Sequence, residues 1–466
     1  MGVFDHIFPR PFVSDYIGRG LPRLQAYGIK NNLAGRSGIK SLARDIYGGK
    51  FCFNGEFLNC GKKSIFSVSL PSKVFAQELH SFGWLDHLRA SGRKIDVLHS
   101  RALFCEWINR SHIFSKGIED TSLRAERLLN FTVHAPFLLN GSDISFQKLF
   151  YSTISREFKK LLFQALFRRN INLAQSLAVC VSVFKGLEPV EQLVDRLLSQ
   201  AVLFEMPDGV PKSRNPAQIV ERLVLYQGNA FRPLMKALKF FTLDNGGLAA
   251  FQGMNINSYS FGVGAKGTSS LQGFGRISAG DSTVIIDSRR FLALEICSGS
   301  LRLATQLGGP SKIGGKWEKL SLLAAAHSAP ESMSAISNTD LASLEITELS
   351  ITAINDPFKR KVDLSDDGMT ITGSDDLLPQ SRAMDLSLRF HLDPNCHVEP
   401  SPEGRGVLVV KDIQIWHITC ENADMVIEDS ISILGRDKPI CAKQICMKKQ
   451  NLENNLPIYW TFKRVA

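Results

Sequence analysis

The stretch "LDNGGLAAFQG", residues 243–253, separates two halves of the chain that differ in their hydrophobic periodicity. Six glycines lie between residues 253 and 275, which makes the crossing between the halves rich in loops. Ligand sites are frequent between domains, so this region predicts a cleft. We place the domain boundary near residue 250.

The half before this stretch has the apolar spacing of helices. In "PVEQLVDRLLSQAVLF", residues 189–204, the apolar residues recur at intervals of three and four and predict one buried helical face. Similar stretches recur through residues 1–250 without a fixed repeat length. Successive helices that each have one apolar face predict a bundle or a curved array of helical hairpins.

The half after this stretch alternates apolar and polar residues. Segments such as "LEITELSITAI" (344–354), "MDLSLRFHLD" (384–393) and "IYWTFKRV" (458–465) are typical of half-buried strands, separated by Asp, Asn, Gly and Pro turns. Residues 251–466 therefore predict an antiparallel sandwich or roll. The fold class is multidomain, with a helical domain at 1–250 and an antiparallel β domain at 251–466.

Composition narrows the class of partner. The 466 residues are 44% apolar and 21% charged, as in ordinary globular proteins. No apolar run reaches the roughly 18–20 residues that cross a bilayer, and no export signal is visible at the N-terminus. The net charge of +10 favours an anionic partner, namely a polysaccharide, a nucleic acid or a membrane surface. Nucleic acid is disfavoured because aromatic residues that could stack on bases are not interleaved with the cations.

Motifs for cofactors are absent from the sequence. It contains no P-loop, no dinucleotide loop in a strand–helix context, and no HExxH. His327, at the end of an apolar run, is the histidine among the ten that most resembles a site residue, although a structural histidine is the default interpretation.

In "MPDGVPKSRNP", residues 206–216, Asn215 suits an N-cap and Pro216 the first helical position. Whether Asn215 only caps a helix or also contacts a substrate stays open.

The motifs of both halves resemble those of the bacterial heparinase II/III-like family. The ordered segments include "FGWLDHLRA" (82–90), "MPDGVPKSRNP", "LALEICSGSLRLATQLGGP" (292–310), "AAAHSAPESM" (324–333) and "MTITGSDDLL" (369–378). The likeness covers roughly residues 40–465. It implies an incomplete α/α toroid followed by an antiparallel β-sandwich, which agrees with the two periodicities.

The resemblance also implies a reaction. Active members cleave uronic-acid polysaccharides by β-elimination, in which the C5 proton of a uronate is removed and the glycosidic oxygen is expelled. The enzyme must neutralise the carboxylate and supply a base and an acid. By resemblance, Asn215, Tyr259 and His327 are the candidate catalytic residues. Arg214, Arg289 and Arg290 are candidates for binding the acidic substrate.

A zinc ion organises the site in relatives, and its ligands are only partly matched. His327 corresponds to one ligand, whereas Ser288 and Gln306 occupy the other two positions. A serine hydroxyl and a glutamine amide are poor zinc ligands. We therefore expect a degraded zinc site and no certain cofactor.

Two functions follow from the sequence. The first is a polysaccharide lyase that cleaves acidic polysaccharide. The alternative is a degenerate member that binds acidic polysaccharide, or serves envelope assembly, without cleavage. The resemblance implies the cell envelope or periplasm, and the missing export signal makes the cytoplasm the alternative. The sequence carries no signal for an oligomeric state.

Overall fold

The computed structural model consists of two compact units. One comprises Met1–Phe204 and Glu221–Phe231, the other Glu205–Val220 and Arg232–Ala466. The structure describes residues 29, 38–53, 55–114, 120–206, 210–212, 216, 219, 232–254, 262, 264–309, 316–333, 341–379, 385–402, 404–434, 439–450 and 456–466. No helix within these ranges has the length and apolarity needed to span a membrane. The predicted division at residue 250, with its cleft, stays a prediction.

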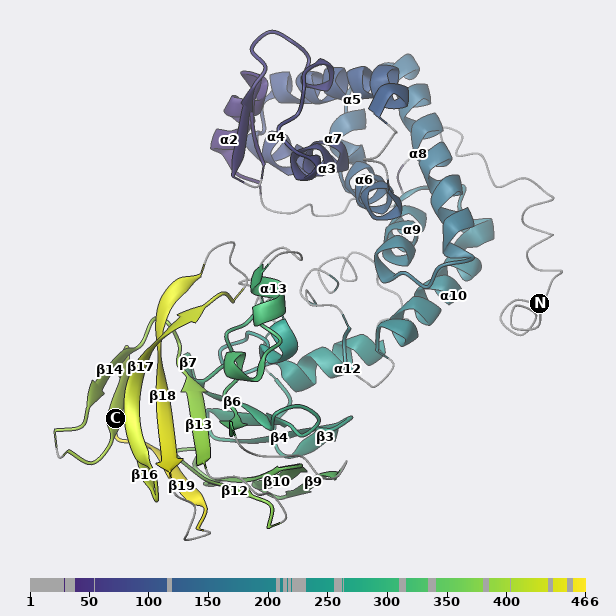
Figure 1. Ribbon diagram of the computed structural model, residues 1–466. Coiled ribbons are helices and arrows are strands. Elements are labelled where there is room, and N and C mark those ends of the chain that lie inside the picture. Colours follow the sequence, from purple (N-terminus) through teal and green to yellow (C-terminus); the bar gives the residue numbers. More distant parts are fainter. Residues whose placement is uncertain are drawn as a thin grey trace. The chain divides into compact units, whose positions relative to one another are not determined.

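The first unit is built from helices and one small hairpin (Figure 1). Its helices are α2 (Lys40–Tyr47), α3 (Lys73–Ser81), α4 (Leu85–Ser91), α5 (Lys94–Phe114), α6 (Thr121–Val133), α7 (Ala135–Leu139), α8 (Ile144–Ala165), α9 (Ile171–Val183) and α10 (Glu188–Glu205), with a 3-10 turn η1 (Ile65–Ser67). The hairpin pairs β1 (Lys50–Phe53) with β2 (Glu56–Asn59).

Short polar side chains begin several of these helices. Ser72, Asp120, Asp143 and Asn170 each accept a hydrogen bond from the backbone N–H three residues later, at 2.7–3.1 Å. These bonds satisfy N–H groups that have no partner within the helix. The helices then bury an aromatic cluster, in which the Phe82 and Phe131 ring centroids lie 4.7 Å apart and those of Phe104 and Phe131 5.0 Å apart. Packing of these apolar faces holds the unit together.

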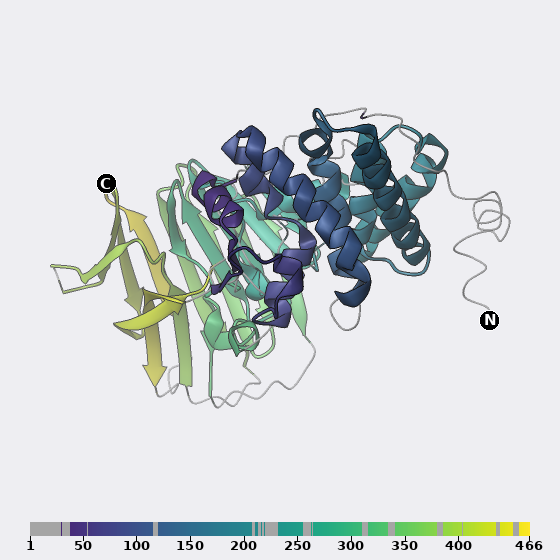
Figure 2. The ribbon, with the colours of Figure 1, turned by 90° about the horizontal axis from the view of Figure 1, so that it is seen from above.

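The second unit contains three antiparallel sheets, seen from above in Figure 2. The five-stranded sheet runs in order β3 (Ser269–Leu271), β4 (Phe274–Ala279), β5 (Ser282–Asp287), β6 (Ala293–Ser298) and β7 (Leu301–Ala304). The four-stranded sheet runs in order β17 (Asp424–Ser432), β18 (Ile440–Gln450), β13 (Asp385–His391) and β8 (Pro330–Glu331). The eight-stranded sheet runs in order β14 (His397–Pro400), β15 (Val407–Lys411), β16 (Gln414–Glu421), β19 (Ile458–Arg464), β12 (Thr370–Leu377), β11 (Phe358–Leu364), β10 (Ser350–Asn355) and β9 (Ala342–Thr347). Short helices α12 (Arg232–Phe241), η3 (Phe251–Gly253), α13 (Lys316–Leu320) and η4 (Ala324–Ala326) complete this unit.

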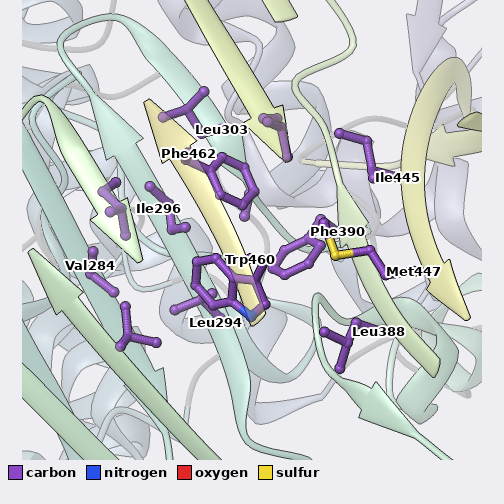
Figure 3. Close-up of a cluster of buried hydrophobic side chains, with 14 of the residues drawn as sticks. Val284, Leu294, Ile296, Leu303, Leu388, Phe390, Ile445, Met447, Trp460 and Phe462 are labelled. Atoms are coloured by element: carbon purple, nitrogen blue, oxygen red, sulfur yellow. The ribbon is translucent and has the colours of Figure 1, made fainter. Parts of the chain in front are cut away.

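One apolar core joins the three sheets. An isolated bridge between Thr305 and His391 brings the five-stranded and four-stranded sheets together. Side chains from both meet those of the eight-stranded sheet (Figure 3), where Phe390 packs edge-on against Trp460 and Phe462, each at 5.3 Å between centroids. Alternation along each strand sends every second side chain into this core, which is the packing of a β-sandwich.

The segment 240–253, which includes the stretch 243–253, covers the other face of the five-stranded sheet. Buried Arg276 donates to the carbonyls of Phe240 and Thr242, both at 2.8 Å. Arg302 donates to the carbonyl of Leu248 at 2.8 Å, and Glu295 accepts from the Ala250 N–H at 2.9 Å. Strands β5 and β6 are consequently buried on both faces. Charged side chains of the sheet therefore bind the backbone of this stretch.

The predicted fold class is confirmed: helices, which the resemblance implied to form an incomplete α/α toroid, are followed by the antiparallel β-sandwich that the periodicity predicted. One detail differs, because "LEITELSITAI" is a hairpin rather than one strand. Its turn, between Thr347 and Ser350, contains neither glycine, asparagine nor proline. The alternation of apolar residues continues through this turn, so the sequence pattern does not indicate that a turn is present.

Candidate functional site

His327 lies at the centre of a buried polar network in the second unit. It follows η4, and its side chain is 3% exposed. Its Nδ1 lies 3.0 Å from Oε1 of Gln306, which follows β7. The same Oε1 accepts the backbone N–H of Ser328 at 3.0 Å, and Gln306 Nε2 donates to the Leu294 carbonyl at 2.7 Å. The amide of Gln306 is thereby held in one orientation.

This orientation decides the tautomer of His327. Because Oε1 can only accept, Nδ1 must carry the proton, and the lone pair lies on Nε2. Nε2 has no hydrogen-bond partner in the described part of the chain. Burial, aided by the nearby His391 and Arg290, lowers the pKa of His327 to about 4. At neutral pH the residue is an uncharged imidazole with an available lone pair.

A strained turn between β5 and β6 lies against this imidazole. Phe291 and Leu292 have φ values of 57° and 50°, and neither is glycine. Two successive residues in this left-handed region cost on the order of 1–3 kcal/mol each and require support from their surroundings. The Phe291 ring stacks on His327, with centroids 5.7 Å apart. The turn also carries exposed Arg290, whose guanidinium lies 5.9 Å from the Phe291 centroid.

A buried ion pair supports this turn. Arg360 of β11 donates to the Leu292 carbonyl at 2.8 Å and to the Ser328 carbonyl at 3.2 Å. Its other side forms two bonds with Asp375 of β12, at 2.6 and 3.1 Å, and Trp460 donates to Asp375 at 2.8 Å. One guanidinium therefore ties the strained turn to the residue next to His327. This positions Phe291 and His327 relative to each other.

The described residues near His327 do not fit a zinc ion. Both oxygen and nitrogen of Gln306 are used within the network, and Ser288 donates its hydroxyl to the Gly273 carbonyl at 2.7 Å. The neighbouring His391 bonds to Ser430 through Nδ1 and to the Ala325 carbonyl through Nε2, both at 3.0 Å. Over the described ranges, no group of three or more His, Cys, Asp or Glu side chains could hold a metal. A single free imidazole nitrogen does not make a zinc site.

The residues predicted from the sequence are only partly brought together. His327, Gln306 and Arg290 share one neighbourhood. Arg289 is held by Asp287, with its Nε 3.2 Å from Oδ1, and lies 4.4 Å from the Phe274 centroid. Asn215, Arg214 and Tyr259 lie outside the described residues, although Pro216 and Ile219 are helical. Their roles stay predictions.

Sequence reasoning missed Arg360, Asp375 and the strained turn. A signal for Arg360 existed, because in "FKRKVDL" it shares the alternating face of Val362 and Leu364, which are core residues. An arginine on a buried face predicts a buried acidic partner. The strain at Phe291 had no such signal, because "RRFLAL" contains no glycine or asparagine to mark a left-handed turn.

The fold is similar to that of solved heparan sulfate lyase and heparinase structures. A mutant of heparan sulfate lyase HepC from Pedobacter heparinus superimposes with a TM-score of 0.61 at 12% identity, over 99% of this chain and 88% of that chain. A heparinase III structure gives a TM-score of 0.62 at 12% identity, over 88% and 79% of the two chains. These likenesses show a shared fold.

Part of the β-sandwich also matches a known family in sequence. Residues 357–461 match the family model "Heparinase II/III-like, C-terminal". The resemblance stated from the motifs is thereby confirmed. A comparison with curated proteins finds no match.

Proposed function

We propose that this protein is a polysaccharide lyase that cleaves a uronic-acid-containing polysaccharide by β-elimination. The observation that carries the proposal is the single tautomer of His327, with a free lone pair on Nε2 beside exposed Arg290. A β-elimination needs a base for the C5 proton and positive charge or hydrogen bonds at the uronate carboxylate. His327 supplies the first and Arg290 the second, and the proton that His327 takes up on Nε2 then passes to the expelled glycosidic oxygen.

Charge explains how a weakly basic imidazole could act. The pKa of His327 is about 4 because burial and nearby Arg290 disfavour the imidazolium. A uronate carboxylate bound at Arg290 would bring a negative charge next to the ring and raise this pKa. Proton acceptance by Nε2 would then become favourable only with substrate bound. Arg360 and Gln306 keep the ring in position for this step.

The first test measures unsaturated uronate by ultraviolet absorbance when the full chain is incubated with a panel of uronic-acid polymers. We expect product from at least one polymer and none from a neutral glucan. His327→Gln keeps a similar volume and should lower turnover by about 100-fold, the scale of lost acid–base catalysis. The exposed histidine variant His397→Gln is the control and should retain full turnover.

One observation favours the alternative, a binding protein without catalysis. The described residues offer no zinc ligand set, because Gln306 is committed to His327 and Leu294. If polymer binds with no unsaturated product, and His327→Gln binds as well as the wild type, the lyase proposal is wrong and this alternative holds.

The second test concerns the charge of the ligand. Arg290 is exposed, and a charge-assisted hydrogen bond contributes roughly 1.5–3 kcal/mol, so Arg290→Met should weaken polymer binding by about tenfold. The difference between variant and wild type should shrink as salt rises, since salt screens exposed charges. Lys361→Met removes a half-exposed cation from β11 and should bind like the wild type. Equal losses in both variants would point to net charge rather than to Arg290.

A further inference from the structure

The outer face of the four-stranded sheet carries a cavity of about 600 Å³ that is separate from the His327 network. Its wall contains Glu331 of β8, Ser387 and Arg389 of β13, and Cys446 and Lys448 of β18. The remaining lining residues are Met333, Asp385, Leu388 and Lys449. Cavities of roughly 300–1,000 Å³ are the size that accommodates small-molecule ligands.

Strand register arranges these side chains in rows. Ser387 pairs with Glu331 on one side and with Lys448 on the other, which forms a row of acid, hydroxyl and cation across three strands. Arg389 pairs with Cys446 in the adjacent row. The intervening residues Leu388 and Met447 belong to the apolar core, so the rows lie on the face opposite to it. The arrangement is fixed by the sheet and not by a loop.

Most of the charges in the wall already have partners. Glu331 binds Arg389 Nη1 at 3.0 Å, Lys448 binds Glu428 at 2.5 Å, and Lys449 donates to the Leu456 carbonyl at 2.6 Å. Arg389 Nε is the exception: it is buried and, among the described residues, has no hydrogen-bond acceptor, although the Cys446 thiol lies beside this arginine. A buried donor without a partner is destabilising, and a charged donor is more so, because burial removes its hydrogen bonds to water. The Nε edge of the guanidinium presents parallel donors that match the two oxygens of a carboxylate.

We propose that this cavity binds an acidic sugar unit, with its carboxylate on the Nε edge of Arg389 and its hydroxyls on Ser387, Glu331 and Asp385. Carboxylate side chains accept hydrogen bonds from sugar hydroxyls, and exposed Met333 offers apolar surface to the ring. The lining holds three cations and two carboxylates, which favours a ligand with net negative charge over a zwitterion. The cavity thus forms a second saccharide site, whether or not the protein cleaves its polymer.

The test is calorimetric titration of the full chain with glucuronate, and separately with glucose, glycine and inorganic sulfate. We expect saturable binding of glucuronate at least about tenfold tighter than that of the other three, because each of those lacks either the carboxylate or the hydroxyls. Sulfate that binds as tightly as glucuronate would mean an adventitious ion only. Glycine that binds as tightly would mean a zwitterion site. Either result, or no saturable binding of glucuronate, overturns the proposal.

Variants assign the binding to this cavity. Arg389→Met should weaken glucuronate binding about tenfold, and Arg389→Lys should also weaken it because an ammonium lacks the Nε edge. Arg389→Lys preserves the charge, so it keeps the test valid if the methionine variant unfolds. The control Lys443→Met removes a half-exposed cation from the same strand, outside the cavity, and should have no effect. Unchanged affinity in both Arg389 variants would overturn the assignment.

Discussion

Arg360→Leu is expected to lower the free energy of unfolding of the β-sandwich by about 3–5 kcal/mol. The substitution leaves Asp375 buried without its cation, with Trp460 as its remaining hydrogen-bond donor among the described residues. It also removes the donor that holds the Leu292 and Ser328 carbonyls, so the left-handed turn at Phe291 loses its support. Arg360, which makes all of these contacts, is completely buried, so water cannot replace the hydrogen bonds that are lost.

The measurement is hydrogen exchange of peptides from β11 and β12 under increasing urea, which reports on the sandwich even if the helical unit unfolds separately. Lys361→Met, one residue along the same strand but exposed, should change stability by less than about 0.5 kcal/mol. Arg360→Lys keeps the charge and loses the two-bond geometry, so roughly 1–3 kcal/mol is expected. A loss below 1 kcal/mol in Arg360→Leu would show that the pair is not needed.

The second large effect concerns Glu295 and pH. This carboxyl is completely buried in β6, and burial raises its pKa from 4.5 to about 7 despite Arg302, whose Nη1 lies 3.7 Å from Oε2. The folded state therefore binds the proton more tightly than the unfolded state. Its stabilising contribution is complete below pH 4.5 and is lost as pH rises to about 7. A shift of this size corresponds to about 3 kcal/mol.

Glu295→Gln should remove this dependence. The amide oxygen can still accept from the Ala250 N–H and the Thr305 hydroxyl, while no proton is gained or lost. Relative to the wild type, the unfolding free energy of the variant should rise by about 3 kcal/mol between pH 4.5 and pH 7.5. Urea unfolding at closely spaced pH values measures the difference. The exposed substitution Asp363→Asn is the control, with a profile expected to run parallel to the wild type. Parallel profiles for Glu295→Gln would refute the prediction.

The two residues share one structural role, although Glu295 lies in the five-stranded sheet and Arg360 in the eight-stranded sheet. Glu295 and Arg302 bind the backbone of residues 248–250, and Arg360 binds the turn that follows β5. In both cases a buried charged side chain forms a hydrogen bond with a backbone group that is distant in the sequence. Such contacts cost desolvation and are destabilising when one partner is removed, so they specify where a loop lies.

The sequence by itself determined the architecture. Helical spacing before residue 243 and alternation after residue 253 are local signals, and the described residues form helices and strands as these signals predict. These signals depend only on residues a few positions apart in the sequence, so they can be interpreted before the fold is known. The ordered motifs likewise identified the family, which the match over residues 357–461 confirms.

Tertiary structure alone decided the chemistry of the site. Gln306 was predicted only as a lost zinc ligand, whereas its amide selects the tautomer of His327 across 21 positions of the chain. Arg360 reaches Leu292 across 68 positions, and the row of Glu331, Ser387 and Lys448 exists because three strands share one register. The physical reason is that hydrogen bonds, desolvation and backbone strain depend on which groups meet in space. The periodicity of a sequence predicts which side chains are buried. It does not predict which other groups those side chains contact in the folded protein.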